Sequence, residues 1–265
     1  MLGALFLILA AVATAGIYLG VGVSSLSLWW SLPILIGCYL GVIVLYFVFL
    51  IIASLFLPSK KKPIKKPNAY CRFMIVLTMR YLMGLLRIRL RFHCDRELPQ
   101  EPCVVISNHI SAIDPLTLLA TLKKRNIVYI CKESVLRIPL VGRYIYNAGF
   151  VGINRENGMK ALRTLHRAAE EMKTTGVDVG IFPEGTRSRT GELLRFKTGA
   201  FVLAKNAQSP IVVMTTTGTD RVFKRFPWRS TRVELKVLDV IGRETVEALS
   251  ADELCEQARA IIEQK

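Results

Sequence analysis

The chain has 265 residues, enough for one full domain with an appendage, and its formal net charge is +16. The charge is uneven, because residues 1–94 hold ten basic side chains and no acidic one, which leaves 26 Lys plus Arg residues against 20 Asp plus Glu residues in the rest. This distribution excludes a chain that is basic throughout, and six scattered cysteines without a CxxC pair exclude a dense disulfide framework.

Two long apolar runs open the chain, Leu2 to Val23 and Leu32 to Leu57, and the first 59 residues carry no charged side chain. At a rise of ~1.5 Å per residue, each run can cross a hydrocarbon core of ~30 Å as a helix. A cleaved signal peptide, a buried soluble hairpin and a re-entrant or monotopic insertion are the alternatives. The first run lacks the basic start of a signal peptide. We therefore expect residues 1–59 to form a transmembrane or membrane-inserted helical hairpin.

A cluster of lysines, SKKKPIKKP, follows the second run directly. Lysines at a membrane exit favour the cytoplasmic side, so the sequence predicts a protein of the cell membrane whose following domain faces the cytoplasm. The scattered cysteines are consistent with a cytoplasmic location, because thiols stay reduced in the cytoplasm.

Residues 60–94 form a basic segment in which Arg72, Arg80, Arg87 and Arg91 recur at spacings of eight, seven and four. These spacings place the arginines on one side of a helix, which predicts an amphipathic helix on an anionic membrane surface. Nucleic acid is the competing polyanion for such a basic patch. The neighbouring hairpin favours lipid, so we expect no nucleic-acid partner.

Residues 95–265 alternate between short apolar strands and longer helical stretches, a pattern typical of an α/β domain with a mostly parallel sheet flanked by helices. The expected strands are CVVIS, IVYIC, FVGI, VDVGIF, PIVVMT and RVELKV, and the expected helices are PLTLLATL, MKALRTLHRAAEEMK, TGAFVLAKN and ADELCEQARAIIEQ. Ser250 and Glu253 predict a capping box for the last helix. In such sheets, ligands bind beyond the carboxyl ends of the strands.

The motif NHISAIDP follows the strand CVVIS and combines His109 with Asp114. Pro115 suits the first helical position and disfavours a helical conformation for the residue before it, so we expect Asp114 to be an N-cap and residues 109–113 to fold as a loop. The imidazole can then turn back onto the carboxylate and act as a general base for a hydroxyl. The alternative is that both side chains only cap the loop and the helix.

The motif FPEGTRS follows the strand VDVGIF and offers hydroxyls, backbone amides and a guanidinium group suited to a phosphate. Two further cations, Arg155 and Lys132, stand at the ends of other expected strands. Several cations beside one possible base indicate a phosphorylated substrate.

Four segments in this order, NHISAIDP, GFVGINR, FPEGTRS and SPIVV, resemble the ordered blocks of the glycerolipid acyltransferase family. The similarity covers roughly residues 95–240 and is greatest to the membrane-bound 1-acylglycerol-3-phosphate acyltransferases of bacteria. It implies transfer of a fatty acyl group from a thioester, on coenzyme A or acyl carrier protein, to the sn-2 hydroxyl of lysophosphatidic acid, giving phosphatidic acid without a metal or another cofactor.

The resemblance also implies roles for individual residues. His109 and Asp114 form the catalytic pair. The expected substrate-binding residues are Asn108, Lys132, Arg155, Glu184, Gly185, Thr186 and Arg187.

Three positions depart from the family's usual residues: Gly152, Asn154 and Val213. They leave the catalytic pair intact and leave open the identity of the acceptor and the choice of acyl chain. Two alternative functions are also considered. One is an acyltransferase for another lysolipid or for glycerol 3-phosphate, and the other is a non-catalytic module that binds anionic lipid.

Overall fold

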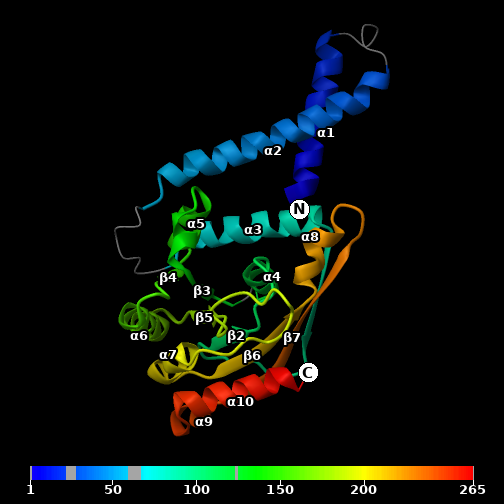
Figure 1. The fold of residues 1–265 in the computed structure, drawn as a ribbon. Helices are drawn as coiled ribbons and strands as arrows, with labels where there is room; N and C mark the ends of the chain where they lie inside the picture. The colour runs from blue at the N-terminus through cyan, green and yellow to red at the C-terminus, as the bar shows by residue number, and fades with distance from the viewer. Residues whose placement is uncertain (1, 22–27, 59–66, 123–124, 265) are drawn as a thin grey trace. The chain divides into compact units, whose positions relative to one another are not determined.

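The computed structural model describes residues 2–21, 28–58, 67–122 and 125–264, which group into two compact units, Met1–Ser59 and Lys60–Lys265 (Figure 1). The lysine cluster after the second apolar run lies outside the described residues.

The first unit consists of two apolar helices. They are α1 (Leu2–Val21) and α2 (Ser31–Leu55), and the short 3-10 helix η1 (Leu28–Trp30) precedes α2. The rings of Phe6 in α1 and Tyr46 in α2 meet edge to face at 5.2 Å between centroids. Both helices are long and apolar enough to cross a membrane. The expected pair of apolar helices is confirmed, and membrane insertion stays a prediction.

The second unit is built on a seven-stranded sheet in the order β1-β7-β6-β2-β5-β3-β4. All neighbouring strands are parallel except β6 and β7, which are antiparallel. The strands are β1 (Ile88–Cys94), β2 (Val104–Ser107), β3 (Ile127–Lys132), β4 (Val151–Ile153), β5 (Asp178–Ile181), β6 (Ile211–Thr217) and β7 (Thr231–Ile241). The mostly parallel α/β sheet expected from the sequence is therefore confirmed.

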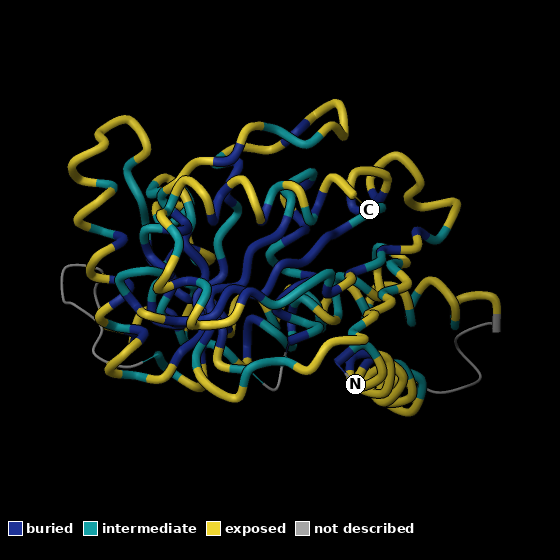
Figure 2. The backbone as a smooth tube through the Cα atoms, turned by 90° about the horizontal axis from the view of Figure 1, so that it is seen from below, coloured by how far each residue is buried: buried dark blue, intermediate teal, exposed yellow. Residues whose placement is uncertain are grey.

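Helices cover both faces of this sheet, with α3 and α4 on one side and α6, α7 and α10 on the other (Figure 1). The sheet and the inner faces of these helices form the buried centre of the unit (Figure 2). The helices of this unit are α3 (Ala69–Leu85), α4 (Asp114–Thr121), α5 (Val141–Asn147), α6 (Gly158–Thr175), α7 (Gly199–Ala207), α8 (Val222–Arg225), α9 (Arg243–Ala248) and α10 (Ala251–Glu263), with the 3-10 helices η2 (Glu133–Arg137) and η3 (Thr219–Arg221). The capping box of Ser250 and Glu253 at the start of α10 is confirmed.

The basic segment differs from the single long helix that its arginine spacing predicted. The helix α3 ends at Leu85, and Ile88 to Cys94 form β1, which pairs with β7. Ile88, Leu90 and Phe92 alternate with polar residues, the period of a strand, and the pairing with β7 satisfies their backbone groups. The arginines therefore do not share one helical face.

Arg72 makes hydrogen bonds within the protein. Its guanidinium donates to the backbone oxygens of Ile127 and Arg125 inside the α/β unit. This arginine ties α3 to the start of β3. It is engaged by protein rather than presented as part of a basic stripe.

Candidate active site

The central strand β2 delivers His109 to the carboxyl edge of the sheet. All four residues of β2 are buried, and the strand lies between β5 and β6. The next residue, Asn108, is fixed to β6, because its Oδ1 accepts from the Thr216 amide at 2.7 Å and its Nδ2 donates to the Thr216 oxygen at 3.0 Å. The Asn108 side chain thus holds the start of the loop, and its role as a substrate ligand stays a prediction.

His109 and Asp114 form a hydrogen-bonded pair, with 2.9 Å between His109 Nδ1 and Asp114 Oδ2. The Asp114 side chain is fully buried, whereas the imidazole keeps 15% of its surface exposed. Among the described residues, none forms a hydrogen bond with His109 Nε2. The carboxylate therefore fixes one ring nitrogen and leaves the other available to a substrate hydroxyl.

Asp114 is held by the loop that precedes it. Its Oδ2 accepts from the amides of Ile110 at 2.8 Å and Ser111 at 2.7 Å, and its Oδ1 accepts from the hydroxyl of Thr219. The expectation that Asp114 is an N-cap is wrong, because Ile113 takes that position and Asp114 is the first residue of α4. An N-cap side chain accepts from amides that follow it, whereas this carboxylate turns back to amides that precede it.

The loop that follows β5, the strand next to β2, packs against His109. The ring of Phe182 stacks on the imidazole at 4.3 Å between centroids and an interplanar angle of 21°. Glu184 is buried, and its two oxygens accept from the amides of His109 at 2.7 Å and Leu194 at 3.1 Å. Burial raises the pKa of Glu184 above its ordinary value, against the lowering effect of these two hydrogen bonds. Glu184 thus supports the backbone of His109.

Two cations meet at Gly185, which has a left-handed φ of +68°. The guanidinium of Arg155 donates to the Gly185 oxygen. The side chain of Lys197 lies over the same residue, since a Cβ on Gly185 would be 3.2 Å from Lys197 Nζ. Burial lowers the pKa of Arg155 from its ordinary value. The left-handed backbone angle favours a glycine here.

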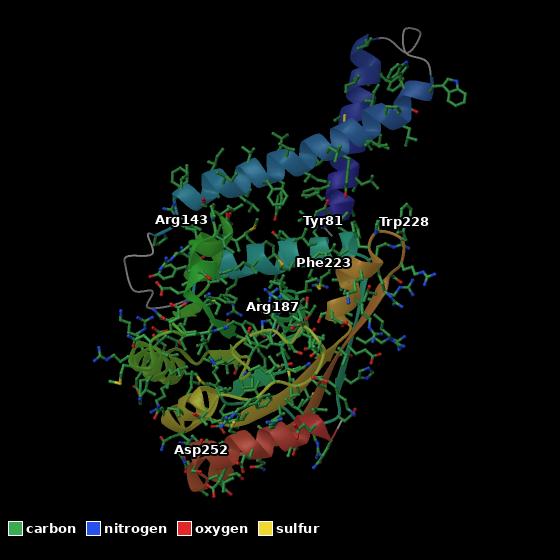
Figure 3. The ribbon with its side chains drawn as sticks, in the orientation of Figure 1. Tyr81, Arg143, Arg187, Phe223, Trp228 and Asp252 are labelled. Atoms are coloured by element: carbon green, nitrogen blue, oxygen red, sulfur yellow. The ribbon has the colours of Figure 1, made fainter. Side chains whose placement is uncertain are left out.

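The other predicted phosphate ligands are exposed at the same edge. Lys132 ends β3 and pairs in register with Ile153 of β4, two residues before Arg155. Thr186 and Arg187 are exposed in the loop after β5, and Figure 3 labels Arg187. Their contacts with a phosphate stay predictions.

Sequence reasoning missed three contributors: Phe182 as a stacking partner, Thr219 as a donor to Asp114, and Lys197 above Gly185. Only Phe182 carried a signal, because it belongs to the motif FPEGTRS. Thr219 is 105 positions from Asp114 in the chain, so no local spacing could pair them.

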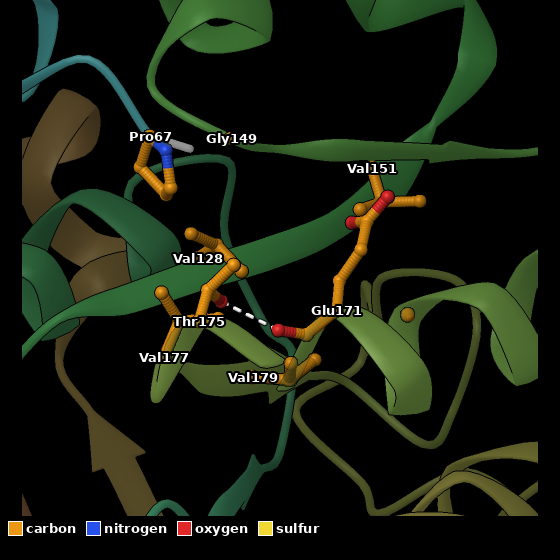
Figure 4. Close-up of a pocket in the computed structure, with 9 residues that line it drawn as sticks. Pro67, Val128, Gly149, Val151, Glu171, Thr175, Val177 and Val179 are labelled. Atoms are coloured by element: carbon orange, nitrogen blue, oxygen red, sulfur yellow. Dashed lines mark hydrogen bonds between the residues drawn. The ribbon is translucent and has the colours of Figure 1, made fainter. Parts of the chain in front are cut away.

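A cavity of about 310 Å³ opens beside this loop, between β3, β4, β5 and the helices α6 and α7. Its lining is mostly apolar, with Ile130, Leu165 and Ile181 among it, and Arg155 and Lys197 supply the charged groups. A second cavity, lined by Pro67, Val128 and Glu171 among others, has a volume of only about 20 Å³ (Figure 4). This second space suits a single water and excludes a substrate.

The chain is similar to known proteins in sequence and in fold. Residues 89–217 match the family model Acyltransferase. The chain is 36% identical over 170 residues to the human 1-acyl-sn-glycerol-3-phosphate acyltransferase beta, covering 63% of this chain and 59% of that protein. It is 32% identical over 189 residues to the bovine 1-acyl-sn-glycerol-3-phosphate acyltransferase alpha, covering 70% of this chain and 64% of that protein.

The fold is similar to the crystal structure of the 1-acyl-sn-glycerophosphate (LPA) acyltransferase PlsC from Thermotoga maritima, with a TM-score of 0.62 at 23% sequence identity. This match covers 83% of this chain and 86% of that one. The chain spans 59% and 64% of the length of the two curated relatives above. Over residues 89–217, which include the paired His109 and Asp114, the chain matches the acyltransferase family model.

Proposed function

We propose that this protein transfers a fatty acyl group from a thioester to the sn-2 hydroxyl of lysophosphatidic acid, giving phosphatidic acid. The observation that carries the proposal is the hydrogen bond between His109 Nδ1 and the buried Asp114, which leaves His109 Nε2 open. An imidazole held in this way is suited to remove a proton from a hydroxyl.

In the proposed reaction, His109 Nε2 takes the proton of the acceptor hydroxyl while its oxygen bonds to the carbonyl carbon of the thioester. Collapse of the tetrahedral intermediate breaks the bond between carbon and sulfur. The imidazolium then returns the proton to the leaving thiolate. Asp114 orients the ring and stabilises its positive charge throughout.

The phosphate of the acceptor would be bound by Arg155, Lys132 and Arg187 at the same edge, where charge-assisted hydrogen bonds are strong. The adjoining apolar cavity has room for hydrocarbon beside two cations. Coenzyme A and acyl carrier protein are both candidate carriers of the acyl group.

Purified full-length protein in detergent micelles tests this proposal when it is given lysophosphatidic acid with acyl-coenzyme A or acyl-carrier protein, and phosphatidic acid is measured by mass spectrometry. We expect product with at least one donor. A panel with other lysolipids and glycerol 3-phosphate separates the alternative acceptors. Thioester that stays intact with every acceptor would instead support a lipid-binding module and contradict the enzyme.

We also propose that the protein is held in the cell membrane with its α/β unit in the cytoplasm. The apolar helices α1 and α2 support membrane insertion, and the basic sequence of residues 60–66 supports the side. A membrane-impermeant amine reagent should label Lys60 to Lys66 only after cells are permeabilised. Labelling in intact cells would contradict the orientation.

A further inference from the structure

The segment 221–229, which we name the basic–aromatic loop, exposes aromatic side chains that the fold leaves uncovered. It comprises the end of η3, the helix α8 and the turn before β7. Phe223 is 65% exposed, Phe226 38% and Trp228 85%. Among the described residues of the α/β unit, Trp228 is the most exposed large hydrophobic side chain. Single exposed apolar residues are ordinary, but three aromatics within six positions form a patch.

Cations are interleaved with these aromatics. Lys224, Arg225 and Arg229 are all exposed, and no carboxylate in the part of the chain that the structure describes lies within ion-pair distance of them. The neighbouring Arg221 is paired with Asp220 at 3.8 Å. The loop therefore presents three positive charges that lack a counter-charge from the protein.

The loop is held in place rather than free. Its first apolar residue, Val222, is fully buried. Arg87 donates to the Pro227 oxygen at 3.1 Å and its own oxygen accepts from the Thr231 amide at 3.1 Å. These bonds tie the turn to the segment between α3 and β1, so the aromatic rings are presented outward by the scaffold.

We propose that the basic–aromatic loop is a membrane-contact surface of the α/β unit, which places Phe223 and Trp228 among anionic lipid head groups. Trp and Phe favour the interface between head groups and acyl chains, and Lys and Arg beside them are attracted to anionic lipid. This charge complementarity and the interleaving of rings with cations favour a lipid surface over a protein partner. The inference stands apart from the proposed acyl transfer, because it requires no substrate.

The three tryptophans of the chain, Trp29, Trp30 and Trp228, allow a direct test. Full-length protein carrying Trp29→Phe and Trp30→Phe leaves Trp228 as the single emitter. It is reconstituted into vesicles of equal parts phosphatidylglycerol and phosphatidylcholine, with or without bromine on the acyl chains of the phosphatidylcholine. We expect Trp228 emission to shift to the blue in the unbrominated vesicles and to lose intensity in the brominated ones.

A matched control moves the emitter to the opposite end of the same unit. Figure 3 shows Asp252, at the start of α10, far from Phe223 and Trp228. A variant with Trp29→Phe, Trp30→Phe, Trp228→Phe and Asp252→Trp should not be quenched by brominated lipid. Equal quenching of the two variants, or none at Trp228, would overturn the proposal.

Charge removal tests whether the three cations contribute to the contact with anionic lipid. Lys224→Ala, Arg225→Ala and Arg229→Ala together should reduce Trp228 quenching to the level seen in vesicles of phosphatidylcholine alone. Unchanged quenching would overturn the contribution of the three cations. If Trp228 is protected from acrylamide without being quenched by brominated lipid, a protein partner or a second copy covers the loop, and the lipid assignment is overturned.

Discussion

Asp114 receives hydrogen bonds from two backbone amides and from the Thr219 hydroxyl, in addition to its bond with His109. Thr219 is fully buried at the start of η3 and follows Gly218, which has a φ of +86°. A hydroxyl that donates to a buried carboxylate oxygen satisfies that oxygen and fixes its orientation. The Thr219 hydroxyl therefore helps to position Asp114 beside His109.

Replacing Thr219 by valine should lower kcat and leave KM for the acceptor nearly unchanged. A hydrogen bond to a charged group contributes about 1.5–3 kcal/mol, so we expect a loss of roughly 10- to 100-fold in kcat. The measurement is steady-state acyl transfer by Thr219→Val, with Thr219→Ser as the control that keeps the hydroxyl. Equal activity of the two variants would show that the hydroxyl does not act on the pair.

Glu184 should act on kcat as well, because its carboxylate is occupied by the amides of His109 and Leu194 rather than open to a phosphate. In Glu184→Gln, the amide NH₂ faces one of these N–H groups, which leaves a buried donor unsatisfied at a cost of about 1–3 kcal/mol. We expect lower kcat and a lower unfolding temperature. A variant with raised acceptor KM and unchanged kcat would instead favour the predicted role of Glu184 in binding glycerol phosphate.

Much of this site could be predicted because its motifs follow adjacent strands. NHISAIDP follows β2 and FPEGTRS follows β5, and the two strands are parallel neighbours, so their carboxyl ends deliver both motifs to one edge. The pairing of His109 with Asp114 was expected on local grounds and is confirmed. Thr219 and Lys197 could not be predicted, because their places depend on tertiary contacts with no local sequence pattern.

At the scale of elements, hydrophobic patterning located the six strands and four helices that were expected in residues 95–265. The short helices α5, α8 and α9 have too few turns to show a period. The strand β1 was missed because its arginines continued the spacing of the preceding helix, although its apolar residues alternate. Pairing with β7 makes this segment a strand, although its arginines have the spacing of a helix.

The amino-terminal ends of three strands are joined by an ion pair between a partly buried arginine and a buried aspartate. Arg125 contacts Asp178 through two nitrogens, at 2.5 and 2.7 Å, and Asp178 also accepts from the Cys103 amide at 2.9 Å. This arrangement connects β3, β5 and β2 at the edge opposite His109. Its contribution should therefore be to stability rather than to chemistry.

Arg125→Met should destabilise the α/β unit by about 3–5 kcal/mol, because it leaves the Asp178 charge buried without a partner. The matched control is Arg137→Met, which removes the exposed pair with Glu133 and should change stability by at most about 1 kcal/mol. Thermal unfolding of both variants measures the difference. Equal unfolding temperatures would contradict a structural role for this ion pair.

At the scale of the whole molecule, the chain combines an apolar helical unit with an α/β unit that carries the hydrogen-bonded pair of His109 and Asp114. The helices α1 and α2 expose apolar side chains along their length, unlike the helices of a soluble core. A lipid acceptor with one acyl chain partitions into a membrane leaflet. An enzyme that acts on it benefits from being held at the same surface.

Full-length protein should stay with membranes after a high-salt wash and be released by detergent. Salt screens attraction between surface charges, whereas it does not weaken burial of apolar helices in hydrocarbon. Sedimentation of washed membranes, followed by immunoblotting of both fractions, measures this. Recovery in the soluble fraction after the salt wash would contradict insertion of α1 and α2.

The proposed acyl transfer depends most directly on His109 as the base. Purified His109→Ala should be folded, should bind lysophosphatidic acid and should lose acyl transfer by at least about 10² to 10⁴, the usual contribution of a general base. The measurement is phosphatidic acid formed per minute by the variant and by the parent protein, with circular dichroism and lysophosphatidic acid binding measured on the same preparations. Substantial product from the folded variant would contradict the mechanism.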